Sequence, residues 1–250
     1  MEGERRALAL EPNSVEAGAG LVVNLAQRRE LAQAYRQAQD LIRRRPDSAR
    51  AHFASSYVLR YAGLLDEAAN ECETSFVLDA QTGWVRACAV AFMLKGDYAR
   101  AVDYIHTDYG SQWAQALTID TLLRQGKQKE ALETRLPSIP QWGGYDMLLA
   151  FMQHKPASEV AALAGAVKSE DDPEVNYFSA AHLAYSGQTS AALDMLKRAI
   201  DGGYCSYPAL DSDPFLASLR DKPEFREMRS AAMACQKTFL AQRGQRTRGE

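Results

Sequence analysis

Apolar and small residues recur at fixed distances around a series of turns. A glycine occupies each turn, a large apolar residue stands four positions before it, and an alanine stands five positions after it. The groups with this spacing are Leu59, Gly63 and Ala68; Phe92, Gly96 and Ala101; Leu122, Gly126 and Ala131; and Leu183, Gly187 and Ala192. Each group predicts the end of one helix, a tight turn and the start of a second helix. The sequence therefore predicts an array of helix pairs, each packing on its neighbours.

The distances between turns give the length of the repeat. The turn residues, with Arg29 in the first turn, are Arg29, Gly63, Gly96, Gly126 and Gly187. The successive intervals are 34, 33, 30 and 61 residues, and the last is about twice the others. A degenerate turn is therefore expected at 154–156, between a first helix at 142–153 and a second helix at 158–167 with Ser158 as its N-cap.

This pattern divides the chain into repeated units and two terminal segments. Residues 1–14 are expected to be the end of a partial repeat, 202–243 to form C-terminal capping helices and 244–250 to be a disordered tail. The repeats are expected at 15–48, 49–81, 82–111, 112–140, 141–172 and 173–201. The final amphipathic helix, at 226–242, is expected to cover the open end of the array, as terminal repeats do.

Composition narrows the possible classes of function. The net charge of −3 and the pI near 5.9 argue against a general nucleic-acid surface, which is usually strongly basic. The longest nearly apolar stretch, 87–94, is far shorter than the ~20 residues that a spanning helix needs. The first residues also lack the form of a secretory signal. We therefore expect a cytoplasmic protein, with the extracytoplasmic part of a longer membrane-anchored protein as the alternative.

The four cysteines, Cys72, Cys88, Cys205 and Cys235, contain no CxxC spacing, so a zinc site is not expected. Cys72 and Cys88 fall on helices that should touch, and Cys205 and Cys235 both lie near the C-terminus. The favoured interpretation is four buried free thiols that act as small apolar residues. The alternative is one or two disulfides, which would indicate an oxidising compartment.

Motifs of catalysis are missing from the sequence. It contains no P-loop, no nucleophile elbow and no metal-binding pair of histidines. His52 and His182 fall on packing positions, where core histidines are expected. Asp172 and Asp213 each precede a proline, a pattern more typical of helix caps than of metal ligands. The sequence therefore predicts a protein that is not an enzyme and holds neither metal nor cofactor.

The recurring unit resembles the tetratricopeptide repeat (TPR), of roughly 34 residues, over about 15–200. The resemblance rests on the apolar, glycine and alanine positions above and on the exit prolines Pro12 and Pro46. The large residue that a TPR has early in its first helix is replaced, by His52, Val85, Gln115 and Asn176. The resemblance implies an all-α fold, a right-handed TPR superhelix (an α-α solenoid) with C-terminal capping helices. It also implies a scaffold that binds a protein or peptide partner in its concave groove.

A second resemblance concerns residues 204–225, which look like the ending of bacterial TPR arrays fused to a serine/threonine kinase or a winged-helix regulator. The chain contains no HRD or DFG motif of a kinase. This resemblance implies an alternative function, as the sensing or docking C-terminal region of a bacterial signalling kinase or transcription regulator. A further alternative is a self-association module that uses exposed end helices.

The first helix of each TPR lines the inner face of the superhelix. Helical periodicity places the residues 13, 10, 6, 3 and 2 positions before each turn on that face. The peptide-binding groove is predicted to consist of Arg50, Phe53, Tyr57, Arg60, Tyr61, Arg86, Met93, Trp113, Asp120, Arg124, Trp142, Tyr145, Tyr177 and Tyr185. Aromatic residues and arginine are enriched at binding hot spots. Because arginines outnumber carboxylates in the set, we expect an acidic or C-terminal-carboxylate peptide with an aromatic or apolar anchor. The competing interpretation is that the aromatics pack inside a tight superhelix and the arginines are merely solvated.

Overall fold

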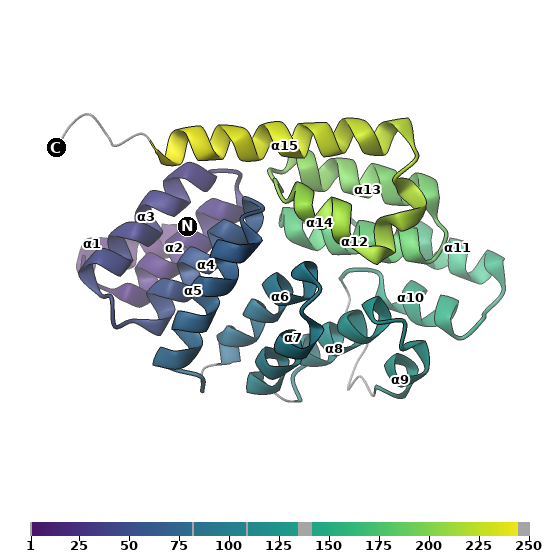
Figure 1. The fold of residues 1–250 in the computed structure, drawn as a ribbon, viewed down its shortest axis with the longest axis horizontal. Helices are drawn as coiled ribbons and strands as arrows, with labels where there is room; N and C mark the ends of the chain where they lie inside the picture. The colour runs from purple at the N-terminus through teal and green to yellow at the C-terminus, as the bar shows by residue number, and fades with distance from the viewer. Residues whose placement is uncertain (1, 82, 109, 135–141, 245–250) are drawn as a thin grey trace.

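The computed structural model describes residues 2–81, 83–108, 110–134 and 142–244, and every regular element within these ranges is helical (Figure 1). The first helices of the pairs are α2 (Val15–Gln27), α4 (Ala49–Tyr61), α6 (Ala89–Lys95), α8 (Gln112–Arg124), α10 (Tyr145–Met152) and α12 (Pro173–Tyr185). Their partners are α3 (Leu31–Arg44), α5 (Leu65–Leu78), α7 (Tyr98–Ile105), α9 (Gln128–Glu133), α11 (Ala157–Ala166) and α13 (Thr189–Asp201). The remaining elements are α1 (Glu2–Leu10), η1 (Gly83–Cys88), η2 (His106–Asp108), α14 (Tyr207–Ser212), η3 (Pro214–Leu219) and α15 (Pro223–Arg243).

The turns between paired helices have the predicted conformation. Gly63, Gly96, Gly126 and Gly187 have φ between 75° and 81°, the left-handed region that glycine enters without steric cost. At the first of them the amide of Leu64 donates to the carbonyl of Leu59 at 2.9 Å, which closes the end of the helix. Among the described residues the non-glycine residues with positive φ are Arg29 and His154, at 70° and 56°. Both stand at turns that were predicted without glycine, so the degenerate turn at 154–156 is confirmed.

The predicted cap of α11 is wrong. Pro156 is the N-cap, and its carbonyl already accepts hydrogen bonds from the amides of Glu159 and Val160, at 2.9 and 3.2 Å. The first turn of the helix therefore closes before Ser158 could cap it. The caps predicted at Asp172 and Asp213 are confirmed, because these carboxylates accept from the amides two residues ahead, at 2.9 and 3.0 Å. The end of the predicted repeat 112–140, from 135 onward, lies outside the described residues, as does 245–250 of the predicted tail.

Small side chains let the paired helices approach closely. The alanines after the turns are fully buried: Ala34, Ala68, Ala101, Ala131 and Ala192. Ala68, for example, packs with Leu59 of its own pair and with Ala91 of the next pair, where a larger side chain would overfill the space. The repeat pattern thus marks positions where the helices pack closely.

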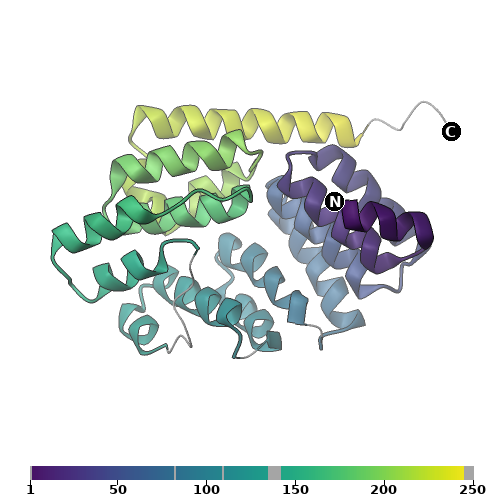
Figure 2. The same ribbon diagram turned by 180° about the vertical axis from the view of Figure 1, so that it is seen from behind.

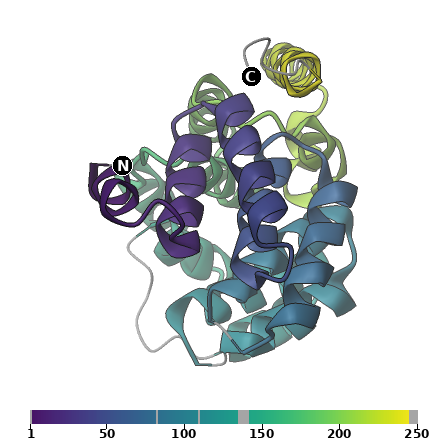
Figure 3. The same ribbon diagram turned by 90° about the vertical axis from the view of Figure 1, so that its left-hand side faces the viewer.

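The array curves until its two ends meet, as the views from the front, from behind and from one side show (Figures 1, 2 and 3). Helix α15 runs from α13 and α14 to α3 along one edge of the molecule (Figure 1). There Phe239 packs edge-on against Tyr35 of α3, with ring centroids 5.6 Å apart. Arg243 also pairs with Glu67 of α5 at 2.8 Å. Helix α15 thus packs on α13 of the last pair and also reaches α3, because the curvature brings the first units within its reach.

The loop after α4 is part of the same closure. The side-chain amide of Gln236 donates to the carbonyl of Ala62 at 3.0 Å, and the amide of Cys205 donates to the carbonyl of Tyr61 at 2.9 Å. A Cβ on Gly63 would lie 2.7 Å from the Gln236 side chain and 2.8 Å from the Cα of Ser206. Gly63 therefore serves both its own turn and the contact between the two ends of the array.

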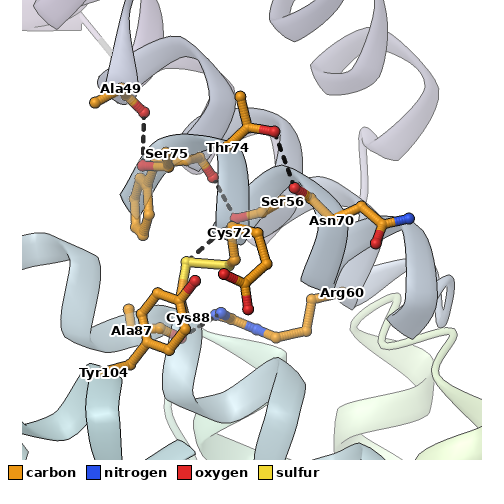
Figure 4. The surroundings of a disulfide bond; sticks show 12 residues. Ala49, Ser56, Arg60, Asn70, Cys72, Thr74, Ser75, Ala87, Cys88 and Tyr104 are labelled. Carbon is orange, nitrogen blue, oxygen red and sulfur yellow. Dashed lines mark hydrogen bonds between the residues drawn. A yellow bond between two sulfur atoms is a disulfide. The ribbon is translucent and has the colours of Figure 1, made fainter. Parts of the chain in front are cut away.

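Two disulfides join segments that the sequence only placed near each other. Cys72 of α5 is bonded to Cys88 at the end of η1 (Figure 4), and Cys205 is bonded to Cys235 of α15. The Cα atoms are 5.8 and 5.3 Å apart, within the range that a disulfide bridges. The favoured interpretation as free thiols is therefore wrong. Helix spacing predicts that two helices touch, but not which side chains point toward each other.

Candidate functional site

Closure of the array places the inner faces of the first helices inside a ring. Nine of the fourteen predicted groove residues are buried: Phe53, Tyr57, Arg60, Tyr61, Met93, Asp120, Arg124, Tyr145 and Tyr177. Arg50, Arg86, Trp142 and Tyr185 are partly exposed, and Trp113 is 44% exposed. Most of the predicted inner face is therefore covered by other parts of the same chain.

A buried ion pair joins the second repeat to the sixth. The Nε and Nη2 atoms of Arg60 on α4 each donate to Glu174 on α12, both at 2.7 Å, although the residues are 114 apart in sequence. The third nitrogen, Nη1, donates to the carbonyl of Ala87 at 2.7 Å (Figure 4). Burial opposes the charge of Arg60, but Glu174 outweighs it and raises the pKa of Arg60. The guanidinium stays charged and links three segments of the ring.

Beside this pair, two tyrosines and a carboxylate form a short chain of hydrogen bonds. The hydroxyl oxygens of Tyr57 and Tyr61 are 2.9 Å apart, and Tyr61 donates to Asp172 at 2.5 Å. Gln27 donates to both Tyr57 and Asp172, at 3.1 and 2.8 Å. Burial, and then the nearby carboxylates, raise the pKa of Tyr57 well above its ordinary value. The tyrosines therefore keep their protons and act as donors that join α2, α4 and the start of α12.

A second buried cluster surrounds Asp120 of α8. Its carboxylate accepts from Tyr145 at 2.8 Å and lies 2.6 Å from Nε2 of His182 and 3.4 Å from Arg124. Burial by itself would raise the pKa of Asp120, but His182, Arg124 and Tyr145 together hold the pKa below its ordinary value. Arg124 also donates to Asp213 at 2.8 Å. Asp120 is thus an ionised carboxylate whose oxygens are occupied by partners within the chain.

His182 is a core histidine, as predicted. Its ring is fully buried, with Nδ1 2.7 Å from the carbonyl of Gly143 and Nε2 on Asp120. Both ring nitrogens face acceptors, so the ring is used entirely in holding α12 against α8 and the segment before α10. The cluster therefore has a structural role.

The arginines that were expected to attract an acidic peptide all have carboxylate partners within the chain. The pairs are Arg50 with Glu16, Arg60 with Glu174, Arg86 with Asp108, and Arg124 with Asp213. Arg60 and Arg124 are buried, Arg50 and Arg86 are partly exposed, and together with their partners the four do not form an unbalanced basic surface. The charge argument for an acidic ligand therefore loses its basis.

A hollow remains at the centre of the ring, which we call the central hollow. Its inner part has a volume of about 240 Å³ and is lined mainly by apolar surfaces and by the paired charges above. Its outer part has a volume of about 540 Å³. The outer part is lined by Asn24, Gln27, Arg28, Trp113, Trp142, Glu170, Asp171, Asp172 and Val175. Gln27, Trp113, Trp142, Asp172 and Val175 line both parts, so the two are continuous.

Two stacked tryptophans stand where the inner and outer parts meet. The rings of Trp113 and Trp142 are 4.3 Å apart between centroids and inclined by 20°. Trp142 also packs edge-on against Tyr145, at 5.2 Å, and the guanidinium of Arg86 lies 6.0 Å from the ring centroid of Trp113. These contacts hold the pair in place while Trp113 keeps nearly half of its surface exposed. An exposed, rigid aromatic pair at a hollow is suited to contact a ligand.

Other predicted groove residues lie away from the central hollow. Arg50 lies over the ring of Trp84 at 5.0 Å, and Phe53 packs against the same ring at 4.8 Å. Tyr185 packs against Phe215, with ring centroids 4.5 Å apart. None of these three predicted residues lines the hollow.

The prediction also missed residues that line the outer part of the hollow, which we call its mouth. Gln27 stands two positions before the turn residue Arg29, which is an inner-face position in the other units. Glu170 and Asp171 lie in the segment between α11 and α12, where no helical period applies. No sequence signal distinguished that segment from other polar loops.

Comparison with known proteins supports the architecture. No protein-family model and no curated protein sequence matches this chain. Among solved structures, the APC/C hetero-tetramer Cut9–Hcn1 is similar with a TM-score of 0.53 at 14% identity, over 97% of this chain and 51% of the matched chain. The chain thus spans about half the length of that relative. YrrB, described as a TPR protein with an unusual peptide-binding site, is similar with a TM-score of 0.42 at 16% identity, over 83% of this chain and 96% of YrrB.

The fold is an all-α superhelix of packed helix pairs. This confirms the fold class predicted from the turn spacing. No helix in the described ranges is long and apolar enough to cross a membrane, and these ranges hold no group of ligands suited to a metal ion.

Proposed function

We propose that this chain is a non-catalytic scaffold for protein–protein interaction, and that it holds a segment of its partner in the central hollow. The stacked pair Trp113 and Trp142 is the observation that carries the proposal. The buried polar groups of the ring are consumed by contacts within the chain, whereas this pair combines rigid placement with exposed apolar surface. The bound segment would bury that surface, a favourable contribution of roughly 25 cal/mol for each Å² removed from water.

Ring closure determines the mode of binding in this proposal. An extended peptide would need the whole inner face, but Tyr57, Arg60, Tyr61 and Tyr177 are covered by other parts of the chain. The inner part of the hollow, about 240 Å³, is smaller than the outer part, about 540 Å³, through which a ligand would enter. The proposal is therefore a side chain or a short turn that enters from the outer part.

The test compares Trp113→Ala with Leu240→Ala, a control that also removes an exposed apolar side chain, from α15. Proteins captured from an extract of the source cell by each variant and by the unchanged chain are compared quantitatively. We expect a specific partner to be lost with Trp113→Ala and kept with Leu240→Ala, while helicity and melting temperature stay unchanged. If Trp113→Ala keeps the same partners, the proposed site fails.

A spectroscopic measurement checks the location directly. The chain has three tryptophans, so Trp84→Phe leaves only Trp113 and Trp142 to report on the hollow. Addition of the captured partner should change the emission of this variant, because burial of Trp113 removes its contact with water. Binding without any change in tryptophan emission would contradict a binding site at Trp113 and Trp142.

Self-association is a second candidate function, favoured by apolar side chains that the fold leaves exposed. Leu10 at the end of α1 is 83% exposed and Val77 near the end of α5 is 82% exposed. A self-association module predicts a mass that rises with concentration in light scattering and falls with Leu10→Lys or Val77→Lys. A constant monomeric mass would contradict self-association and favour the binding of a partner segment in the central hollow.

A further inference from the structure

Two carboxylates at the mouth of the central hollow have no side-chain partner within the described part of the chain. Glu170 and Asp171 are both exposed and line the outer part of the hollow. Their neighbour Asp172 differs, because its carboxylate accepts from Gln27, Tyr61 and the amide of Glu174. The mouth thus presents two carboxylates without a side-chain partner, beside a third carboxylate that is bonded within the chain.

The fold holds this acidic segment in one place. The buried side chain of Asn176 accepts from the amide of Glu170 and donates to its carbonyl, both at 2.8 Å. Asp172 in turn caps α12. The backbone on both sides of Asp171 is therefore anchored, so that only the side chains of the two carboxylates become ordered when a ligand binds.

The surroundings of these carboxylates decide the sign of the local field. Arg28 is the cation that lines the outer part, against Glu170, Asp171 and Asp172. Deeper in, Arg60 and Arg86 have carboxylate partners, and the carboxylate of Asp120 is paired with Arg124. A concave site that carries one sign of charge concentrates the opposite sign. The mouth is negative and the interior is nearly neutral.

The inner part offers mostly apolar surface between its paired charges. Val90, Leu117 and Phe178 line it together with the rings of Trp113 and Trp142. A large apolar or aromatic side chain fits this lining, and a cation next to it would reach the mouth. A ligand cation near Trp113 would also be attracted by the face of the indole ring.

We propose that the occupant of the central hollow is a segment in which a lysine or arginine flanks a large apolar or aromatic residue. The apolar side chain enters the inner part against Trp113 and Trp142, and the cation pairs with Glu170 and Asp171. This inference rests on the proposed function and adds the chemistry of the ligand. The arginines in the sequence led us to expect an acidic ligand, whereas the mouth favours a basic one. An acidic segment would meet like charges at the mouth.

The experiment uses a phage-displayed library of random dodecapeptides, selected on the full chain, and then synthetic copies of the enriched peptides in a fluorescence-anisotropy titration. Enriched peptides are expected to carry lysine or arginine beside a large apolar or aromatic residue. Glu170→Lys/Asp171→Lys is expected to weaken their binding by about tenfold, since two favourable charge contacts become repulsive. Added salt should weaken binding to the unchanged chain and have less effect on Glu170→Gln/Asp171→Gln.

The matched control is Glu133→Lys/Asp221→Lys, which makes the same change of net charge at two exposed carboxylates that do not line the hollow. This control should bind within about twofold of the unchanged chain, because screening removes most of a distant surface charge. Circular dichroism and melting temperature check that each variant folds. Equal weakening by the control would show a net-charge effect and overturn the inference.

The outcomes separate this inference from the proposed function. Loss of binding with Trp113→Ala together with weakening by charge reversal at the mouth supports both. Loss with Trp113→Ala but unchanged or tighter binding after charge reversal, or enrichment of acidic peptides, overturns the ligand chemistry and leaves the binding site standing. Peptides that bind Trp113→Ala as well as the unchanged chain, or no enrichment at all, overturn both.

Discussion

The buried pair between Arg60 and Glu174 should be the single interaction whose loss most weakens the closed ring. Its side chains are 2% and 9% exposed, and its two hydrogen bonds are both 2.7 Å long. Arg60→Met leaves the carboxylate of Glu174 buried and without its cation, and Glu174→Met leaves the guanidinium in the same position. Removing one partner of such a pair costs about 3–5 kcal/mol, because the remaining charge stays desolvated.

The size of this loss matters against the total stability. Single domains unfold with about 5–15 kcal/mol, so one substitution would remove a large fraction of it. The double variant Arg60→Met/Glu174→Met should regain at least half of the loss, since replacement of a buried pair by apolar side chains of similar volume is often neutral or stabilising. A simple sum of the two single losses is therefore not expected.

Urea unfolding followed by circular dichroism and by tryptophan fluorescence measures these differences. Coincident transitions show that one free energy describes the unfolding. The surface pair Lys197 and Asp201, 67% and 64% exposed, is the control, and Lys197→Ala should cost only about 0.3–0.5 kcal/mol. A loss of less than 1 kcal/mol for Arg60→Met, or strictly additive single and double variants, would refute the argument that this pair holds the ring closed.

Three further predictions concern other parts of the closure. Gly63→Ala should lower the free energy of unfolding in urea by about 3 kcal/mol, because the added Cβ would meet the other end of the chain. Gly187→Ala, with open space around it, should cost only about 1 kcal/mol for its positive φ, and equal losses for the two variants would contradict the contact. Cys72→Ser/Cys88→Ser should lower the free energy of unfolding by about 3 kcal/mol, the loop-closure value for a separation of 16 residues. A reductant should lower the stability of this variant less than it lowers the stability of the unchanged chain. Because the pKa of Asp120 lies below its ordinary value of 3.8 in the folded state, its ionised form stabilises the fold above about pH 4, and this contribution is lost on acidification. Asp120→Asn should therefore melt at a lower temperature at neutral pH, and its melting temperature should fall less steeply as the pH is lowered.

Local features of the fold could be predicted from the sequence with good accuracy. The spacing of residues within one helix pair marks the glycine turns, the non-glycine turns at Arg29 and His154, and the alanines that are buried. Their periodicity is visible because helix geometry repeats every 3.6 residues and each pair solves the same packing problem. Where the local rule failed, as at Ser158, a neighbouring proline had already begun the helix.

The candidate site was predicted only in part. The count back from the turns placed Trp113, Trp142 and Tyr145 on the inner face, and these residues do lie together at the hollow. The same count treated Arg60 as a ligand-binding residue, because nothing near it in sequence reveals a partner 114 residues away. Glu170 and Asp171 lie between units, where no periodicity selects them.

The sequence by itself determined the all-α class, the position of most turns, the helix pairs and the small residues packed inside them, since all of these follow from contacts between near neighbours along the chain. Only the tertiary structure decided that the array closes into a ring, how the four cysteines pair, and which inner side chains stay accessible. The physical reason is that small rotations from one repeat to the next add up over the array. Their sum brings α4 against α12 and α15 against α3, although no single repeat encodes either contact.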